Sequence, residues 1–264
     1  MLLVGSEVSA SASKSHASSS SGSSSSSSAK PSDDFLVEGL EEFVPAFGQF
    51  DGDFYSGIFS TDPPNTPEKD KEGGNLMFFL FAPDKPLFDD SLVIWFNGGP
   101  GCSSVAGMFF ENSPITVPLE PPGFVGSKGD DPLIWNEYGW TKATAIMYME
   151  QPHGVGFSTG PEPQTEDDVA RYFVNFLQNF YDAFPEWREK RLYLAGESYA
   201  GYYVPSIGHA IHQLNQDQQQ QKINLQGITL GNGWVDAKVQ GPVSRTSFSF
   251  AFCFISSCAH HISR

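Results

Sequence analysis

Two short segments of the chain place a serine among glycines, an arrangement in which the hydroxyl can act as a nucleophile. The segment LAGESYAGYYVP, at residues 194–205, contains Ser198, and the segment GFSTG, at residues 156–160, contains Ser158. Such a nucleophile needs a strand that delivers it and a helix that follows at once, because the first helical N–H groups stabilise charge that develops on a carbonyl oxygen. The expected chemistry is attack on a carbonyl carbon.

The flanking sequence favours Ser198 over Ser158. An apolar run at residues 191–195 is typical of a strand, and residues 199–215 have a helical pattern of apolar residues, although Pro205 should bend its early part. Ser158 is instead followed by GPEP, which prevents a helix from starting at once. We therefore predict that Ser198 is the nucleophile.

The rest of the chain alternates between strand and helix patterns. Short apolar runs ended by Gly or Pro are typical of strands buried on both faces, and they lie at residues 75–83, 91–99, 145–150, 191–196 and 227–233. Thr165 and Asp168 have the spacing of a capping box and should begin a helix. An antiparallel hairpin is expected over residues 47–59, with its turn at Asp51 and Gly52. The pattern predicts an α/β fold with a central, mostly parallel sheet flanked by helices.

Composition divides the chain into three segments. Residues 1–34 are dominated by serine and should be disordered, because they cannot bury enough apolar area to offset the entropy of ordering; a modified stalk is the alternative. Residues 35–240 should form one folded domain. Residues 241–264 are an atypical tail in which Phe, Ser and Cys follow no clear period.

Charge and cysteine content exclude several classes of function. The 31 acidic and 15 basic residues give a formal net charge of −16, which argues against nucleic acid and against an anionic membrane surface as partners. No apolar run reaches the roughly 18 residues of a membrane span, and MLLVG is too short for the core of a signal peptide. The cysteines at positions 102, 253 and 258 lack the spacing of zinc ligands, so neither a metal nor a cofactor is expected.

Four motifs, in this order and at these separations, resemble those of the serine carboxypeptidases, a branch of the α/β-hydrolases. They are WFNGGPGCSS at 95–104, MEQPHGVGFS at 149–158, LAGESYAGYYVP at 194–205 and INLQGITLGNGWVD at 223–236. The resemblance covers roughly residues 43–240. It implies release of C-terminal residues from peptides and proteins, in a vacuole or lysosome or after secretion, and a disulfide at Cys102 whose partner stays unassigned.

The same resemblance assigns roles to individual residues. Ser198 would be the nucleophile, and the main-chain N–H groups of Gly99 and Tyr199 would form the oxyanion hole. The glycines of NGGPG suit this role, because their backbone can come close to a ligand. The substrate's terminal carboxylate would be held by Asn97, Glu111 and Glu197.

Binding of a carboxylate by carboxyl groups requires a shared proton. Like charges raise each other's pKa, so at least one of Glu111, Glu197 and the ligand should be protonated, and binding should be favoured at low pH. Glu197 also bears on the reaction, since related acyltransferases often carry aspartate before the nucleophile. The glutamate is the form found in peptidases, and an acyltransferase is kept as an alternative.

The residues that should complete a catalytic triad are not evident. Hydrolases of this fold place an Asp and then a His after the serine. His209 and His212 follow Ser198, but on a helix they would lie about 16 and 21 Å along the axis from it. His153 precedes the serine, and His260 and His261 lie in the tail. We therefore expect a C-terminally truncated member with a partial domain at residues 35–240, in which the later strands of the sheet are missing. It should lack the triad Asp and His and have impaired activity; a non-catalytic homologue or peptide-binding fragment is the alternative.

Overall fold

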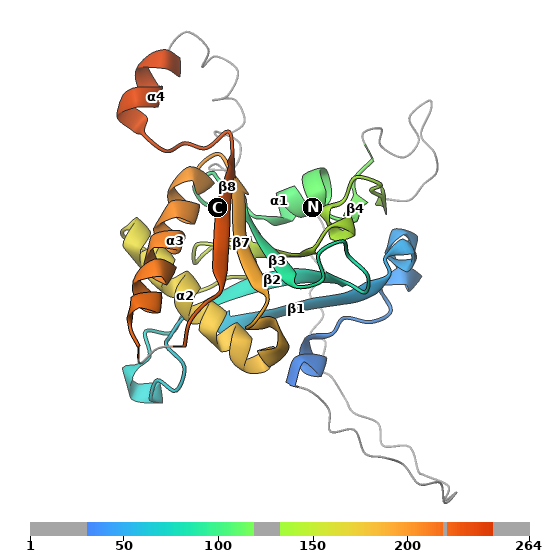
Figure 1. The fold of residues 1–264 in the computed structure, drawn as a ribbon, viewed down its shortest axis with the longest axis horizontal. Coiled ribbons are helices and arrows are strands. Elements are labelled where there is room, and N and C mark those ends of the chain that lie inside the picture. Colours follow the sequence, from blue (N-terminus) through green and yellow to red (C-terminus); the bar gives the residue numbers. More distant parts are fainter. Residues whose placement is uncertain (1–30, 119–132, 219–220, 245–264) are drawn as a thin grey trace, which may run out of the picture. The chain divides into compact units, whose positions relative to one another are not determined.

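A six-stranded sheet with the strand order β1-β2-β6-β3-β7-β8 forms the centre of the protein (Figure 1). The computed structural model describes residues 31–118, 133–218 and 221–244. The strands are β1 Gly52–Ser60, β2 Asn75–Pro83, β3 Ser91–Phe96, β6 Ala145–Glu150, β7 Arg191–Glu197 and β8 Leu225–Gly231. The pairings of β2 with β1 and β6 are antiparallel, and β6-β3, β3-β7 and β7-β8 are parallel. The predicted α/β fold with a mostly parallel sheet is confirmed.

Helices lie on both faces of this sheet. Figure 1 shows α2 and α3 side by side on one face, and α1 near β4 on the other. The helices are α1 Val105–Gly107, a π-helix Met108–Asn112, α2 Glu166–Ala183, α3 Ala200–Gln216 and α4 Ala237–Ser244. The strands β4 Ile115–Thr116 and β5 Ile134–Trp135 form a small second sheet. Short 3-10 helices are Pro31–Phe35, Leu40–Glu42, Pro45–Gln49, Glu68–Asp70, Trp140–Lys142 and Pro185–Trp187.

Alternation along the strands divides the core between the two faces. In β6, which is buried along its whole length, Ala145, Met147 and Met149 contribute to the cluster that α2 and α3 cover. Ile146 and Tyr148 contribute to the cluster on the opposite face, with Met108 of the π-helix. Successive strand side chains point to opposite faces, which explains why this strand is a continuous apolar run.

The helix α2 begins where the sequence predicts it. Thr165 is its N-cap, and the side chains of Thr165 and Asp168 exchange hydrogen bonds with each other's backbone N–H in a capping box. The predicted apolar stripe of Val169, Phe173, Phe176 and Phe180 is buried. Capping and apolar periodicity therefore act together to place this helix on the sheet.

The hairpin expected over residues 47–59 is wrong. Residues 45–49 form the 3-10 helix Pro45–Gln49, and β1 pairs antiparallel with β2 instead. Pro45 has no N–H and a fixed φ, so it suits the first turn of a helix better than a paired strand. The partner of β1 follows only after the connection at residues 61–74.

Several predictions about segments fall mainly outside the described residues. Residues 1–30 of the serine-rich segment and residues 245–264 of the tail lie there, with Cys253, Cys258, His260 and His261. Residues 31–34 of the serine-rich segment belong to the 3-10 helix Pro31–Phe35, and residues 241–244 of the tail belong to α4. The three segment boundaries therefore stay predictions.

Candidate functional site

Ser198 lies at a sharp corner between β7 and α3. Its φ of 56° is in the left-handed region, which residues other than glycine rarely adopt. The carbonyl of Ser198 accepts hydrogen bonds from the N–H groups of Gly201 and Trp234, at 3.0 and 2.7 Å, and its own N–H donates to the Gly231 carbonyl at 3.0 Å. These bonds hold the strained backbone from both sides. The structure thus has the strand, turn and helix that a nucleophilic serine requires.

The glycine-rich loop after β3 packs directly against this corner. A Cβ atom on Gly98 would lie 2.4 Å from the backbone nitrogen of Tyr199 and 2.8 Å from Cβ of Ser198, so only glycine fits there. Gly99 follows with a φ of 112°, which also favours glycine. The two main-chain segments predicted to form the oxyanion hole, residues 98–99 and 198–199, are therefore in contact, although they follow different strands.

Asn97 joins two acidic side chains at the end of the sheet. Its Oδ1 accepts hydrogen bonds from Nε1 of Trp95 at 2.9 Å and from the N–H of Gly107 at 3.0 Å, which fixes the orientation of the amide. Its Nδ2 then donates to Oε1 of Glu197 at 2.9 Å and to Oε1 of Glu111 at 3.3 Å. The structure therefore brings the three residues predicted to bind a carboxylate into one hydrogen-bonded cluster.

Trp95 and Gly107 belong to this cluster but were not singled out from the sequence. A Cβ atom on Gly107 would lie 2.3 Å from Nε1 of Trp95 and 2.5 Å from Oδ1 of Asn97. Trp95 stands two residues before Asn97, and alternation along a strand directs both side chains to the same face. That spacing could have identified Trp95; Gly107 has no comparable signal, because its role depends on the approach of a helix to the strand end.

The electrostatics of the cluster favour the neutral form of Glu111 more than water does. Partial desolvation, and then the nearby carboxylate of Glu197, raise the pKa of the Glu111 carboxyl above its usual range, although the hydrogen bond from Asn97 opposes this. Although Glu111 as a whole residue is exposed, its carboxyl group is partly desolvated where it accepts the hydrogen bond from Asn97. A neutral Glu111 could donate a hydrogen bond to a ligand carboxylate, as the ionised form cannot.

Replacing Glu111 by glutamine should flatten the pH dependence of carboxylate binding. In the native protein the affinity should fall as the pH rises through the raised pKa of Glu111, because the ionised side chain repels the ligand. Glutamine stays neutral and keeps donors for the ligand. Calorimetric titration with an N-acyl amino acid at a series of pH values measures this. An equally steep pH dependence in both proteins would contradict the role given to Glu111.

Ser158 occupies a structural position. It is 2% exposed, its hydroxyl donates to the carbonyl of Glu150, and it accepts a hydrogen bond from the N–H of Met77 at 2.9 Å. A buried hydroxyl with both roles in use cannot reach a substrate in this conformation. The arrangement agrees with the preference for Ser198.

The described histidines do not serve Ser198. The ring of His153 is hydrogen-bonded to Oγ1 of Thr61 at 3.0 Å and to the carbonyl of Pro161 at 2.9 Å, and burial lowers its pKa. His209 and His212 lie on α3 beyond its second turn, and His209 contacts Gln213. Within residues 31–118, 133–218 and 221–244, no imidazole is hydrogen-bonded to the Ser198 hydroxyl.

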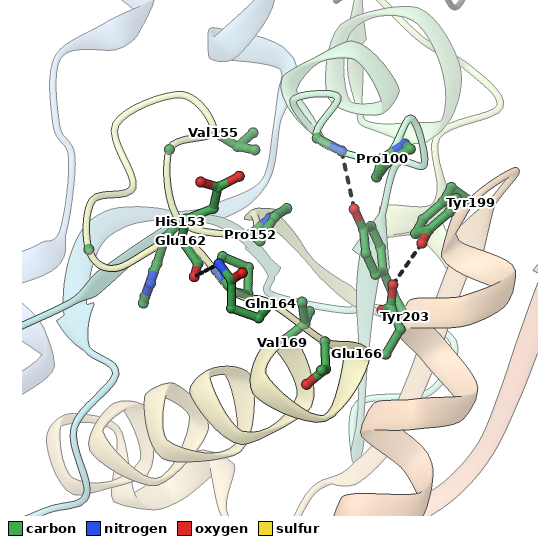
Figure 2. A pocket seen from close by; sticks show the side chains of 15 residues that line it. Pro100, Pro152, His153, Val155, Glu162, Gln164, Glu166, Val169, Tyr199 and Tyr203 are labelled. Carbon is green, nitrogen blue, oxygen red and sulfur yellow. Dashed lines mark hydrogen bonds between the residues drawn. The ribbon is translucent and has the colours of Figure 1, made fainter. Parts of the chain in front are cut away.

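A cavity of about 770 Å³ lies beside the glycine-rich loop, between it and the helices α2 and α3 (Figure 2). Its lining includes Pro100, Gly101, His153, Glu166, Tyr199 and Tyr203.

None of the described helices is long and apolar enough to cross a membrane. The part of the chain that the structure describes has no group of three or more His, Cys, Asp or Glu side chains that could hold a metal ion.

Comparisons with known proteins agree with this geometry. The family model described as serine carboxypeptidase matches residues 51–259. Serine carboxypeptidase-like 48 of Arabidopsis thaliana is 37% identical over 168 residues, which are 62% of this chain and 31% of that protein. The pheromone-processing carboxypeptidase KEX1 of Coccidioides posadasii is 40% identical over 172 residues, which are 62% of this chain and 25% of that protein.

A solved structure shares the fold as well. Kex1(delta)p, a prohormone-processing carboxypeptidase from Saccharomyces cerevisiae, matches with a TM-score of 0.68 at 27% identity, over 81% of this chain and 47% of that chain. The chain spans about a third or less of the length of the two curated relatives, at 31% and 25%. Because the family model matches most of the chain and the fold agrees, the protein belongs to the serine carboxypeptidase family.

Proposed function

We propose that this chain binds the C-terminal carboxylate of a peptide and presents Ser198 to the last peptide bond, as a serine-type carboxypeptidase. The observation that carries the proposal is the hydrogen-bonded cluster of Asn97, Glu111 and Glu197 next to the Ser198 corner. A carboxylate bound to this cluster would distinguish the end of a peptide from its interior. Peptide and protein C-termini are therefore the proposed substrates.

The chemistry follows from the positions of the groups. Oγ of Ser198 would attack the carbonyl carbon of the last peptide bond, and the N–H groups of Gly99 and Tyr199 would stabilise the negative charge on its oxygen. The C–N bond then breaks, the terminal amino acid leaves with the proton from the hydroxyl, and water hydrolyses the ester that remains on Ser198.

Proton transfer is the step for which no described imidazole is in place. A base must take the proton of Ser198 and return it to the leaving nitrogen, but His153 and His209 are hydrogen-bonded to other groups, and His212 lies on α3 beyond its second turn. We propose that this base and its acidic partner lie outside the described residues. This observation also favours a second function, in which the chain binds peptide C-termini without cleaving them.

Two peptides that differ only at the C-terminus test the proposal. Purified protein is incubated near pH 5 with an N-blocked dipeptide as the free acid and as the amide, and products are measured by mass spectrometry. Release of the last residue from the free acid alone is expected, with Ser198→Ala as the control that removes the nucleophile. Equal release by the native protein and Ser198→Ala would contradict catalysis. Calorimetric titration of Ser198→Ala with the two peptides measures binding alone, and equal affinity for acid and amide would also exclude the non-catalytic function.

A further inference from the structure

We propose that the hydroxyl of Tyr203 is a positioning group that fixes the glycine-rich loop against α3 and so sets the distance between the two N–H groups of the oxyanion hole. This inference rests on the proposed function. The two N–H groups, of Gly99 and Tyr199, belong to segments that follow different strands, β3 and β7. Stabilisation of an oxyanion requires donors at fixed positions, so something must hold these segments in register.

A hydrogen bond connects the two segments. The N–H of Gly101 donates to the hydroxyl oxygen of Tyr203 at 3.1 Å, and the two residues are 102 positions apart in sequence. Figure 2 shows the Tyr203 side chain reaching from α3 to the loop beside Pro100. Gly101 is two residues after Gly99, and Tyr203 is one helical turn after Tyr199. The bond therefore joins the segments close to both donors.

The burial of Tyr203 indicates that its hydroxyl has a purpose beyond packing. The side chain is 1% exposed, and burial raises the pKa of the phenol. A buried hydroxyl destabilises the protein unless it is hydrogen-bonded, so phenylalanine would fill this position at less cost if only the ring mattered. The bond to the loop is what the hydroxyl adds.

The first turn of α3 lacks one helical hydrogen bond and makes a further contact with its surroundings. Pro205 lies within the helix and has no N–H, so the carbonyl of Gly201 lacks its usual helical partner. The hydroxyl of Tyr199 donates to Oε1 of Glu166 at 2.8 Å, which attaches this turn to α2. The rings of Tyr199 and Tyr203 lie 5.1 Å apart, so both anchors act on one packed unit.

Amide exchange measured by NMR tests the proposal directly. Tyr203→Phe removes the hydroxyl and keeps the ring, and Tyr202→Phe, on the same helix turn without a hydrogen bond to the loop, is the matched control. The N–H of Gly101, which donates to the Tyr203 hydroxyl, should exchange at least several times faster in Tyr203→Phe than in the native protein or the control. Unchanged exchange at Gly101 would overturn the proposal.

Kinetics on the same three proteins provide the functional test. In Tyr203→Phe, kcat for the free-acid dipeptide should fall about tenfold to a hundredfold with little change in KM, because small misplacements of catalytic groups have effects of this size. Faster exchange with an unchanged kcat would overturn the positioning role. No release by any of the three proteins would contradict the proposed function, and the exchange rates would then decide on Tyr203 alone.

Discussion

Replacing Asn97 by leucine is expected to weaken binding of a peptide C-terminus about tenfold to a hundredfold, since a hydrogen bond to a charged group contributes about 1.5–3 kcal/mol. Asn97 is 5% exposed, and its amide connects Glu111 and Glu197. Without it the two carboxyl groups lose the donor that orients them. Titration of the protein with an N-acyl amino acid at low pH measures the loss.

The same change should also lower the free energy of unfolding. Nε1 of Trp95 and the N–H of Gly107 both donate to Oδ1 of Asn97 and would be left without an acceptor. Each buried donor without a partner costs about 1–3 kcal/mol. Denaturant unfolding separates this effect from binding, because a variant that is folded and still binds poorly shows that the amide supports ligand binding as well as stability.

Asn97→Asp is the informative control. Aspartate keeps an acceptor for Trp95 and the Gly107 N–H but adds a third carboxyl group beside Glu111 and Glu197. Like charges disfavour ionisation, so binding should be lost near neutral pH and should recover toward the native affinity on acidification, whereas the leucine variant should stay weaker than the native protein at every pH. Native affinity in the leucine variant would contradict the role proposed for Asn97.

The sequence predicts the positions of the strands well, but burial on both faces holds only for the central strands β3, β6 and β7. The expectation is wrong for β8, which has no buried residue because it is the last strand of the described sheet. The limits predicted for β2 and β6 are those observed, since each is an apolar run with a turn residue or a charge at its end. The hairpin prediction was wrong because the pairing partner of a strand is determined by packing across the whole sheet. Nothing local to residues 47–59 indicates that β1 pairs with β2.

The parts of the site differ in how far local sequence specifies them. Ser198 could be chosen over Ser158 because strand, turn and helix follow one another within a few residues. The contact of Asn97 with Glu197 joins residues 100 positions apart, and only the resemblance to a family brought them together. The bond between Tyr203 and the loop had no signal at all, because it depends on the parallel pairing of β3 with β7.

Replacing Phe78 by alanine is expected to lower the free energy of unfolding by about 3–5 kcal/mol, as large-to-small changes in a packed core do. The side chain is 0% exposed on β2. Its ring lies within 6.3 Å of the rings of Phe35, Phe59, Phe176, Phe180 and Phe184. Such a cluster interlocks through stacked, tilted and edge contacts, so neighbouring rings cannot simply collapse into the space that is left.

This loss is large relative to the roughly 5–15 kcal/mol that separates folded from unfolded states of a typical domain. Phe110→Ala is the matched control, because that side chain is 68% exposed and its removal should change the unfolding free energy little. Chemical denaturation followed by circular dichroism measures both variants. A cost below about 1 kcal/mol at Phe78 would show that the cluster repacks, contrary to the rigid core inferred from its close-packed rings.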